Sequence, residues 1–270
     1  MLKIGIVGAG GRMGHALIET VLAAPDLVLA GALVRKGSAQ AGRDAGELVG
    51  AAATGVVLGS DLHAVLAAAD VLVDFSTPET TATLLDACVE TQTPLVIGVT
   101  GMDAALNRRI VTAGARIAIV RAANMSLGVN LLLQLAQQVA ATLDDGFDIE
   151  ISEAHHRHKK DAPSGTALAL GEAVAAGRGV TLDTHAVYGR AGKHGERAAG
   201  SIGFNSVRAG EIVGDHSVLF AGPGERIELT HRAESRAAFA RGALAAARWL
   251  HGRPAGLYGM AEVLGLAAGK

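Results

Sequence analysis

The sequence contains one cysteine, Cys88, few aromatic residues and no long hydrophobic run. One cysteine excludes an intramolecular disulfide and fits a reducing compartment. No segment approaches the roughly 18 consecutive apolar residues that a membrane-spanning helix requires. The chain opens with the pattern of a buried strand instead of the charged and apolar regions of a signal peptide. These absences predict a cytoplasmic protein that does not bind membranes.

Neither sign of charge dominates the chain, because 24 Lys and Arg stand against 26 Asp and Glu, for a net charge of −2. Nucleic-acid binding needs a broad basic face and usually aromatic side chains for stacking. Only 3% of the residues are aromatic, so a nucleic-acid partner is not expected. A small-molecule ligand remains the expected partner.

The first 126 residues alternate short apolar runs with alanine-rich helical stretches. Continuous apolar strands spaced by helices indicate a parallel sheet covered on both faces, which is a doubly wound (Rossmann-like) α/β domain. The expected strands have the sequences KIGIVG, LVLAGALV, DVLVDFS, TPLVIGVT and RIAIVRAAN.

A second α+β domain with a mixed or antiparallel sheet is predicted from the change of pattern after residue 147. Residues 126–143 predict a linking helix with Ser126 as N-cap and an apolar face at four positions. Strands follow at 147–154, 201–210, 211–222 and 224–233, and the glycine-rich segment 188–203 predicts a mobile loop. The positions on the apolar face of the helix are Leu127, Leu131, Leu135 and Val139.

The helix after Ser235 is expected to return to the first domain. The predicted dinucleotide-binding domain therefore comprises residues 1–126 and 236–270. Residues 127–235 form the predicted domain for substrate binding and oligomerisation.

The motif GAGGRMG, residues 8–14, lies between the first strand and the first helix. Glycines in this position let the backbone approach a pyrophosphate, and the helix N-terminus stabilises its charge. The spacing departs from the strict G-x-G-x-x-G pattern, and a tight turn without a ligand would also use glycine. The residues predicted to bind the cofactor here are Gly8, Ala9, Gly10, Gly11, Arg12 and Met13.

The end of the second strand, GALVRKGS, predicts the kind of cofactor. An acidic residue at this point binds the ribose hydroxyls of NAD, whereas arginine accommodates the 2′-phosphate of NADP. Val34 cannot accept those hydrogen bonds, while Arg35 and Lys36 can pair with a phosphate. NADPH is therefore the predicted preferred cofactor, with NADH also possible; the alternative is that both cations are simply solvated.

The stretch EAHHRHKKDAPSGTA places a basic cluster, residues 155–160, between a strand end and the helix start at residues 161–166. Free N–H groups and the helix dipole also favour negative charge there, so an anion site is expected. A metal site at the three histidines is disfavoured, because the neighbouring arginine and lysines would repel a cation.

The motifs GAGGRMG, DFSTPE, GVTG, AANMSLGVN and EAHHRHKKDAPSGTA together resemble those of the 4-hydroxy-tetrahydrodipicolinate (dihydrodipicolinate) reductase family, from Ile4 to about Leu264. The resemblance implies an oxidoreductase that transfers a hydride from NAD(P)H to a cyclic dicarboxylate in diaminopimelate and lysine biosynthesis. It also implies a homotetramer assembled through the sheet of the second domain.

The resemblance further implies specific roles. His155 and Lys159 would act in proton transfer, and His156, Gly165 and Thr166 would bind the substrate carboxylate. Two positions depart from some family members: Val34 replaces a glutamate, which argues against efficient use of NADH, and Thr77 replaces an arginine. The residues implied for the nicotinamide side are Gly98, Val99, Thr100, Ala122, Ala123, Asn124 and Met125.

Two other functions use part of the same sequence. A semialdehyde dehydrogenase would need a cysteine nucleophile, but Cys88 lies within a predicted helix and fits a core position better. A regulatory protein that binds NADPH without catalysis would keep the glycine motif and have no need of His155 or Lys159. Asp74, at a strand end, is expected to cap the following loop.

Overall fold

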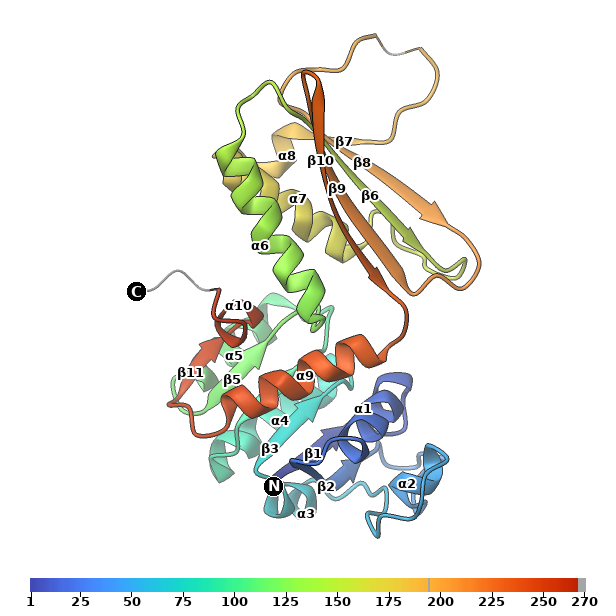
Figure 1. The fold of residues 1–270 in the computed structure, drawn as a ribbon. Coiled ribbons are helices and arrows are strands. Elements are labelled where there is room, and N and C mark those ends of the chain that lie inside the picture. The colour runs from blue at the N-terminus through green and yellow to red at the C-terminus, as the bar shows by residue number, and fades with distance from the viewer. Residues whose placement is uncertain (194, 267–270) are drawn as a thin grey trace. The chain divides into compact units, whose positions relative to one another are not determined.

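The computed structural model describes residues 1–193 and 195–266 (Figure 1). Residue 194 of the predicted loop and residues 267–270 of the predicted first domain lie outside the described residues. The chain divides into two compact units. The first comprises Met1–Leu127 and Arg236–Lys270, and the second comprises Gly128–Ser235.

Within the described residues, the first unit forms a six-stranded sheet in which every paired strand is parallel. In spatial order the strands are β11 (Gly256–Tyr258), β5 (Ala118–Arg121), β4 (Leu95–Ile97), β3 (Val71–Asp74), β1 (Leu2–Val7) and β2 (Leu27–Leu33). The helices are α1 (Arg12–Leu22), α2 (Ala45–Leu48), α3 (Leu62–Ala68), α4 (Pro78–Thr91), α5 (Ala104–Gly114), α9 (Ala237–Leu250) and α10 (Met260–Val263).

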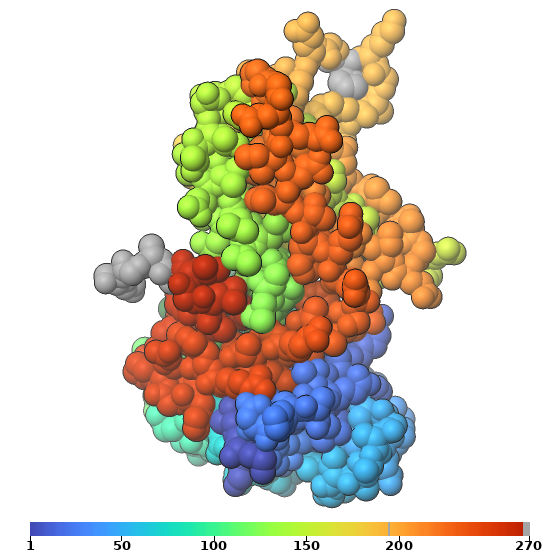
Figure 2. All heavy atoms as spheres, in the orientation of Figure 1, coloured from blue at the N-terminus to red at the C-terminus, as the bar shows by residue number. Residues whose placement is uncertain are grey.

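Two hydrophobic clusters cover the two faces of this sheet. One cluster joins alternate strand residues, such as Ile4 and Val73, to α1 and α9. The other joins the intervening residues, such as Leu72 and Ile97, to α3, α4 and α5. Figure 2 shows the red atoms of α9 against the blue atoms of α1. A parallel sheet with helices on both faces confirms the predicted Rossmann-like class. Its strands are apolar throughout because both of their faces are buried.

The second unit contains a five-stranded mixed sheet within its described residues. β9 is antiparallel to β6 and β10, whereas β6, β8 and β7 are parallel. The strands in spatial order are β10 (Glu225–Ala233), β9 (Gly214–Gly222), β6 (Asp148–His155), β8 (Ile202–Arg208) and β7 (Ala186–Tyr188). The helices are α6 (Leu127–Thr142), α7 (Gly165–Arg178) and α8 (Leu182–His185).

One face of this mixed sheet packs against helices through a core that includes Ile151 and Phe220. The predicted alternation in β10 is confirmed, since Ile227 and Leu229 pack against that core. The predicted face of α6 is wrong: Leu131 and Leu135 are 43% and 38% exposed. The helix instead buries Val129, Leu132, Ala136 and Ala140. Its apolar residues extend around more than one face, so periodicity alone does not choose the buried side.

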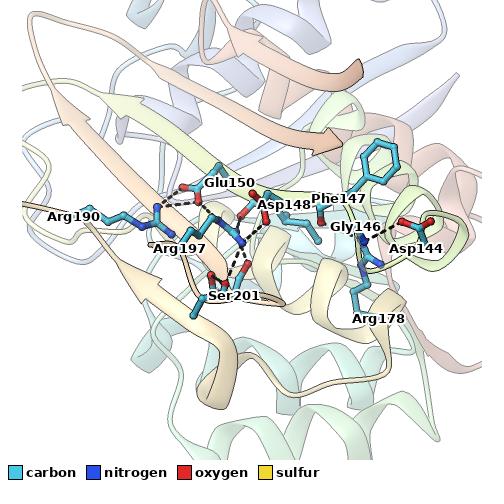
Figure 3. A network of polar contacts seen from close by, with 11 residues as sticks. Asp144, Gly146, Phe147, Asp148, Glu150, Arg178, Arg190, Arg197 and Ser201 are labelled. Carbon is cyan, nitrogen blue, oxygen red and sulfur yellow. Dashed lines mark hydrogen bonds and ion pairs between the residues drawn. The ribbon is translucent and has the colours of Figure 1, made fainter. Parts of the chain in front are cut away.

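Two arginines tie the glycine-rich segment before β8 to strand β6 (Figure 3). Arg197 donates to Asp148 at 2.7 Å and to the backbone carbonyl of Ile149 at 2.9 Å. Arg190 donates to both carboxylate oxygens of Glu150, at 2.9 and 3.0 Å. These bonds occupy the outer face of β6 and leave its inner face to the core and the candidate site.

None of the helices within residues 1–193 and 195–266 combines the length and apolar character needed to cross a membrane.

Candidate active site

The predicted cofactor residues of the first unit all follow the carboxyl ends of its parallel strands. Gly8 follows β1, Arg35 lies beyond β2, Gly98 follows β4 and Ala122 follows β5. Hydrogen bonds join neighbouring strand ends, from Gly98 N–H to Asp74 O at 2.9 Å and from Ala122 N–H to the carbonyl that ends β4 at 3.2 Å. In open parallel sheets, ligands bind at this edge.

The glycine loop holds a conformation that requires glycine at two positions. Gly8 has φ +82°, where a side chain is strained, and an added Cβ would lie 2.8 Å from the backbone oxygen of Phe75. A Cβ on Gly14 would overlap the carbonyl oxygens of Gly8 and Ala9. These glycines therefore let α1 start directly against the end of β1.

Helix α1 begins at Arg12, and no described side chain caps its N-terminus at Gly11. Helices α4, α5 and α7 differ, because Thr77, Asp103 and Ser164 accept hydrogen bonds from their first turns. The first N–H groups of an α-helix need acceptors from outside the helix. The start of α1 is thus suited to an anion such as a pyrophosphate.

A cavity of about 960 Å³ extends from this loop along the same sheet edge. It is lined by Gly8, Gly10, Gly11, Arg35 and Lys36, among others. Both cations are exposed, whereas Val34 is only 6% exposed and offers no side-chain acceptor. The residues present fit a dinucleotide that carries an additional phosphate. Arg12 is exposed and is not among the residues that line this cavity.

Asp74 and Cys88 have structural roles. Asp74 accepts hydrogen bonds from Ser76 N–H at 2.9 Å and from the Thr81 hydroxyl at 2.6 Å, which joins β3 to α4 as expected of a cap. Cys88 is fully buried, and burial, with the nearby Asp74, raises its pKa to about 12. A buried thiol with that pKa stays protonated, so Cys88 is a core residue rather than a nucleophile.

In the second unit, the inner face of the sheet changes from apolar to polar toward the end of β6. Ile149, Ile151, Glu153 and His155 are the buried residues of this strand. His216 of β9 lies directly opposite Glu153 and is also buried. The strand register therefore brings a carboxylate and two imidazoles together under the start of α7.

Glu153 is the centre of this group, with 2% of its surface exposed. Its Oε2 atom lies 2.6 Å from His155 Nδ1, and its Oε1 atom accepts the Ser164 N–H at 3.2 Å. Arg208 of β8 donates to both oxygens, at 2.8 and 2.7 Å. Burial by itself raises the pKa of Glu153, but the bonds from Arg208 and His155 outweigh it and lower the pKa to about 2. Glu153 is therefore a carboxylate at neutral pH.

The two histidines are held in their neutral forms. Burial lowers the pKa of His155, and the hydrogen bond to Glu153 opposes that effect. Burial lowers the pKa of His216 to about 4, and repulsion from the His155 ring whenever that ring is protonated acts in the same direction. The two rings meet edge to face, with centroids 5.1 Å apart. His216 Nε2 lies 3.0 Å from Ser164 Oγ, which also accepts the N–H of Ala167 as N-cap of α7.

The remaining residues of the basic cluster lie in the turn between β6 and α7. Lys159 Nζ pairs with Asp161 at 2.9 Å, and its side chain is 21% exposed. His156 is half-buried and its ring centroid lies 6.2 Å from that of His158. In the part of the chain that the structure describes, no group of three or more His, Cys, Asp or Glu could hold a metal ion.

The start of α7 is open toward a ligand. Gly165 is exposed, and a Cβ added to it would meet nothing within 4 Å. Thr166 follows in the first helical turn and is half-buried. One end of the second unit thus joins His155, Lys159 and an accessible helix N-terminus, which can bind an anion and exchange protons.

Known protein families match both halves of the sequence. Residues 2–125 match the family described as dihydrodipicolinate reductase, N-terminus, and residues 128–264 match dihydrodipicolinate reductase, C-terminus. The chain belongs to the dihydrodipicolinate reductase family. The proposed resemblance is confirmed.

Individual members of the dihydrodipicolinate reductase family are similar in sequence to this chain over nearly its whole length. The 4-hydroxy-tetrahydrodipicolinate reductase of Burkholderia mallei (strain SAVP1) is 56% identical over 265 residues, which are 98% of each chain. The enzyme of the same name from Burkholderia pseudomallei (strain 668) is also 56% identical, over 98% of this chain and 100% of its own.

A solved dihydrodipicolinate reductase has the same fold. The dipicolinate-bound enzyme from Paenisporosarcina sp. TG-14 superposes with a TM-score of 0.78 at 24% identity, over 97% of this chain and 98% of its own. Amine dehydrogenase from Mycobacterium smegmatis is more distant, with a TM-score of 0.59 at 12% identity over 95% of this chain and 94% of its own.

The sequence motifs predicted the dihydrodipicolinate reductase family and the role of His155, but they did not predict the buried partners of His155. Glu153, Arg208 and His216 were not singled out as site residues. Glu153 and His216 occupy the alternate positions that also carry apolar core residues, Ile151 in β6 and Val218 in β9. A charged or titratable residue at a strand position that faces the core indicates that its side chain has a polar partner.

Proposed function

We propose that this chain reduces 4-hydroxy-tetrahydrodipicolinate to tetrahydrodipicolinate with NAD(P)H, as a step of diaminopimelate and lysine biosynthesis. The observation that carries the proposal is the joint placement of His155, Lys159 and the open start of α7 at one end of the second unit. A cyclic dicarboxylate needs anion sites on rigid backbone and a nearby acid, and this group of residues supplies both.

The substrate residues divide into binding and proton transfer. Gly165 and Thr166, at the exposed start of α7, bind one carboxylate together with His156. Lys159, whose Nζ pairs with Asp161 at 2.9 Å, donates a proton to the reduced ring. His155 takes part as a proton donor or acceptor at the nitrogen that does not face Glu153.

The cofactor residues belong to the first unit. Residues 8–13 bind the pyrophosphate, Arg35 binds a 2′-phosphate, and residues 98–100 and 122–125 line the nicotinamide. When bound, the nicotinamide supplies the hydride. NADPH is the proposed preferred cofactor, because Arg35 and Lys36 line the cavity and Val34 offers no acceptor for a ribose hydroxyl.

The test is a coupled assay in which the substrate is formed from pyruvate and aspartate semialdehyde and the absorbance of NADPH is followed. We expect oxidation of NADPH that depends on both precursors. If NADPH binds but is not oxidised with this substrate, the chain is a binding protein without this reductase activity.

The same assay tests the proton donor. Lys159→Ala should lower kcat by about 10²- to 10⁴-fold, the usual contribution of a positioned acid. Lys193→Ala removes an exposed lysine of the same unit and should leave kcat unchanged. A Lys159→Ala variant with wild-type kcat would remove Lys159 from the proposed mechanism.

We also propose a cytoplasmic homotetramer, which rests on the family resemblance and on an outer sheet face that carries exposed residues such as Val207 and Thr230. Mass measurement by light scattering during gel filtration tests the assembly, and four copies are expected. A monomer at assay concentration would contradict it.

A further inference from the structure

One buried carboxylate contacts both halves of the proposed substrate site. Glu153 Oε2 meets the ring of His155 at Nδ1, 2.6 Å away, and Glu153 Oε1 accepts the N–H of Ser164, the N-cap of α7. His216 also reaches both places, through an edge-to-face contact with the His155 ring and a 3.0 Å contact between its Nε2 and Ser164 Oγ, whereas Glu153 forms a hydrogen bond with each of them.

We infer that Glu153 is a positioning residue for the proposed reduction: its two oxygens hold the His155 ring and the start of α7 in one fixed arrangement, with Nδ1 protonated. The inference rests on the proposed function, since it assigns the geometry of that site. Glu153 touches no substrate in this scheme and acts through His155 and Ser164.

The charge of Glu153 fixes the tautomer of His155. Arg208 forms a paired hydrogen bond with the carboxylate, and the pKa of Glu153 lies at about 2. An ionised carboxylate only accepts hydrogen bonds, so Nδ1 of His155 must carry a hydrogen. Nε2 is therefore the nitrogen that gains or loses a proton, as required of a general acid or base.

The space at Nε2 is kept open by Gly214 of β9. A Cβ built on Gly214 would lie 3.1 Å from His155 Nε2, which is closer than carbon and nitrogen normally approach. Gly214 lies on the same buried face as His216, one alternation along β9. The strand thus leaves room beside the nitrogen that Glu153 does not occupy.

A purely structural role does not account for Glu153. Ile149 and Ile151 hold the same face of β6 in the core without any charge. A buried ion pair must recover the cost of removing two charges from water, and an apolar residue of similar size often stabilises as well or better. The carboxylate instead matches what a histidine in proton transfer needs, which is a partner that sets its orientation and tautomer.

Charged and titratable groups from several elements act on His155. Glu153 raises its pKa, while burial and the cations Lys159 and Arg208 lower it. His216 lies against the ring and is itself affected by His231 of β10. Removal of the one negative charge among them should therefore lower the pKa of His155 further.

The first experiment uses the wild-type protein, with NMR of ring nitrogens in isotope-labelled histidine and assignment by the loss of one signal in His155→Asn. We expect neutral His155 to carry its hydrogen on Nδ1. A neutral ring with its hydrogen on Nε2 would overturn the inference, whether or not the chain reduces the proposed substrate.

The second experiment compares two variants on the same strand. Glu153→Gln should lower the pKa of His155, followed by NMR, by about 1–3 units. The matching limb of the pH profile of kcat/KM should shift equally. Glu150→Gln removes a carboxylate that is also bound to arginines but lies on the outer face of β6, and should shift neither.

The outcomes separate the two proposals. An unchanged His155 pKa in folded Glu153→Gln would overturn the positioning role. Absence of reductase activity in the wild type would instead refute the proposed function. Gly214→Ala adds an independent check, because crowding at Nε2 should lower kcat at least tenfold while the tautomer is kept. Wild-type kcat in that variant would contradict the assignment of Nε2.

Discussion

At the scale of single residues, the proposed preference for NADPH depends on one exposed guanidinium. Arg35 lines the cavity beside the glycine loop, and the preceding Val34 is buried. A hydrogen bond between charged groups contributes about 1.5–3 kcal/mol, which corresponds to roughly ten- to a hundredfold in affinity. Arg35→Ala should lower the ratio of kcat/KM for NADPH over NADH by that factor.

The control for this measurement is Arg108→Ala, which removes an exposed arginine of α5 that does not line the cavity. It should leave the ratio unchanged. An unchanged ratio in Arg35→Ala itself would show that the 2′-phosphate is bound elsewhere or not at all.

Single residues were predictable where local chemistry decides their role. The buried thiol of Cys88 and the capping carboxylate of Asp74 follow from positions within a helix and at a strand end. Arg208 and His216 reach Glu153 only through the pairing of β8 and β9 with β6. That pairing joins residues more than 50 positions apart, as between Glu153 and Arg208 with a separation of 55, and no local pattern predicts it.

At the scale of elements, the contact between β1 and α1 depends on Gly14. A methyl group there would overlap two backbone oxygens, which cannot move as a flexible side chain can. Gly14→Ala should lower the unfolding free energy by about 1–3 kcal/mol and weaken NADPH binding. Denaturant unfolding and fluorescence titration with NADPH measure the two effects.

Gly11→Ala is the matched control for stability, because a Cβ on Gly11 lies at an ordinary 3.4 Å from the Gly8 oxygen. It should change the unfolding free energy much less than Gly14→Ala. Equal stability losses in the two variants would show that the loop does not require close backbone approach at Gly14.

The long elements were predictable because their patterns extend over several turns or alternations. Strands β1 and β2 of the first sheet and the alternation in β10 are examples. The three-residue strands β7 and β11 were not expected, since they are too short to show a period and owe their place to neighbours. The prediction of which side of α6 is buried was wrong for a related reason. Leucines occur on more than one face of this helix, and its packing against the sheet decides which face is buried.

At the scale of the whole molecule, buried His216 makes stability depend on pH. Its pKa falls from an ordinary 6.5 to about 4 in the folded protein. Between these values the unfolded chain binds a proton that the folded chain does not, so stability is lost as pH falls through that range. The loss at pH 4 is on the order of 3 kcal/mol.

His216→Gln keeps a polar group near Ser164 and removes the titration. Unfolding in denaturant at several pH values between 6.5 and 4 should show a smaller loss of stability in this variant than in the wild type. His63→Gln, which replaces an exposed histidine of α3, should keep the wild-type dependence. Parallel wild-type and His216→Gln curves would mean that His216 is protonated in the folded state.

The return of the chain to its first unit has a consequence for how the protein is made. Helix α9 supplies fully buried residues such as Ala243, Leu244 and Leu250 to one face of the first sheet, and β11 adds its edge strand. Both are synthesised after the entire second unit. On the ribosome, residues 128–235 can therefore fold around their own core before α9 has been synthesised. Until then, the face of the first sheet that α9 covers stays exposed to solvent with its apolar residues.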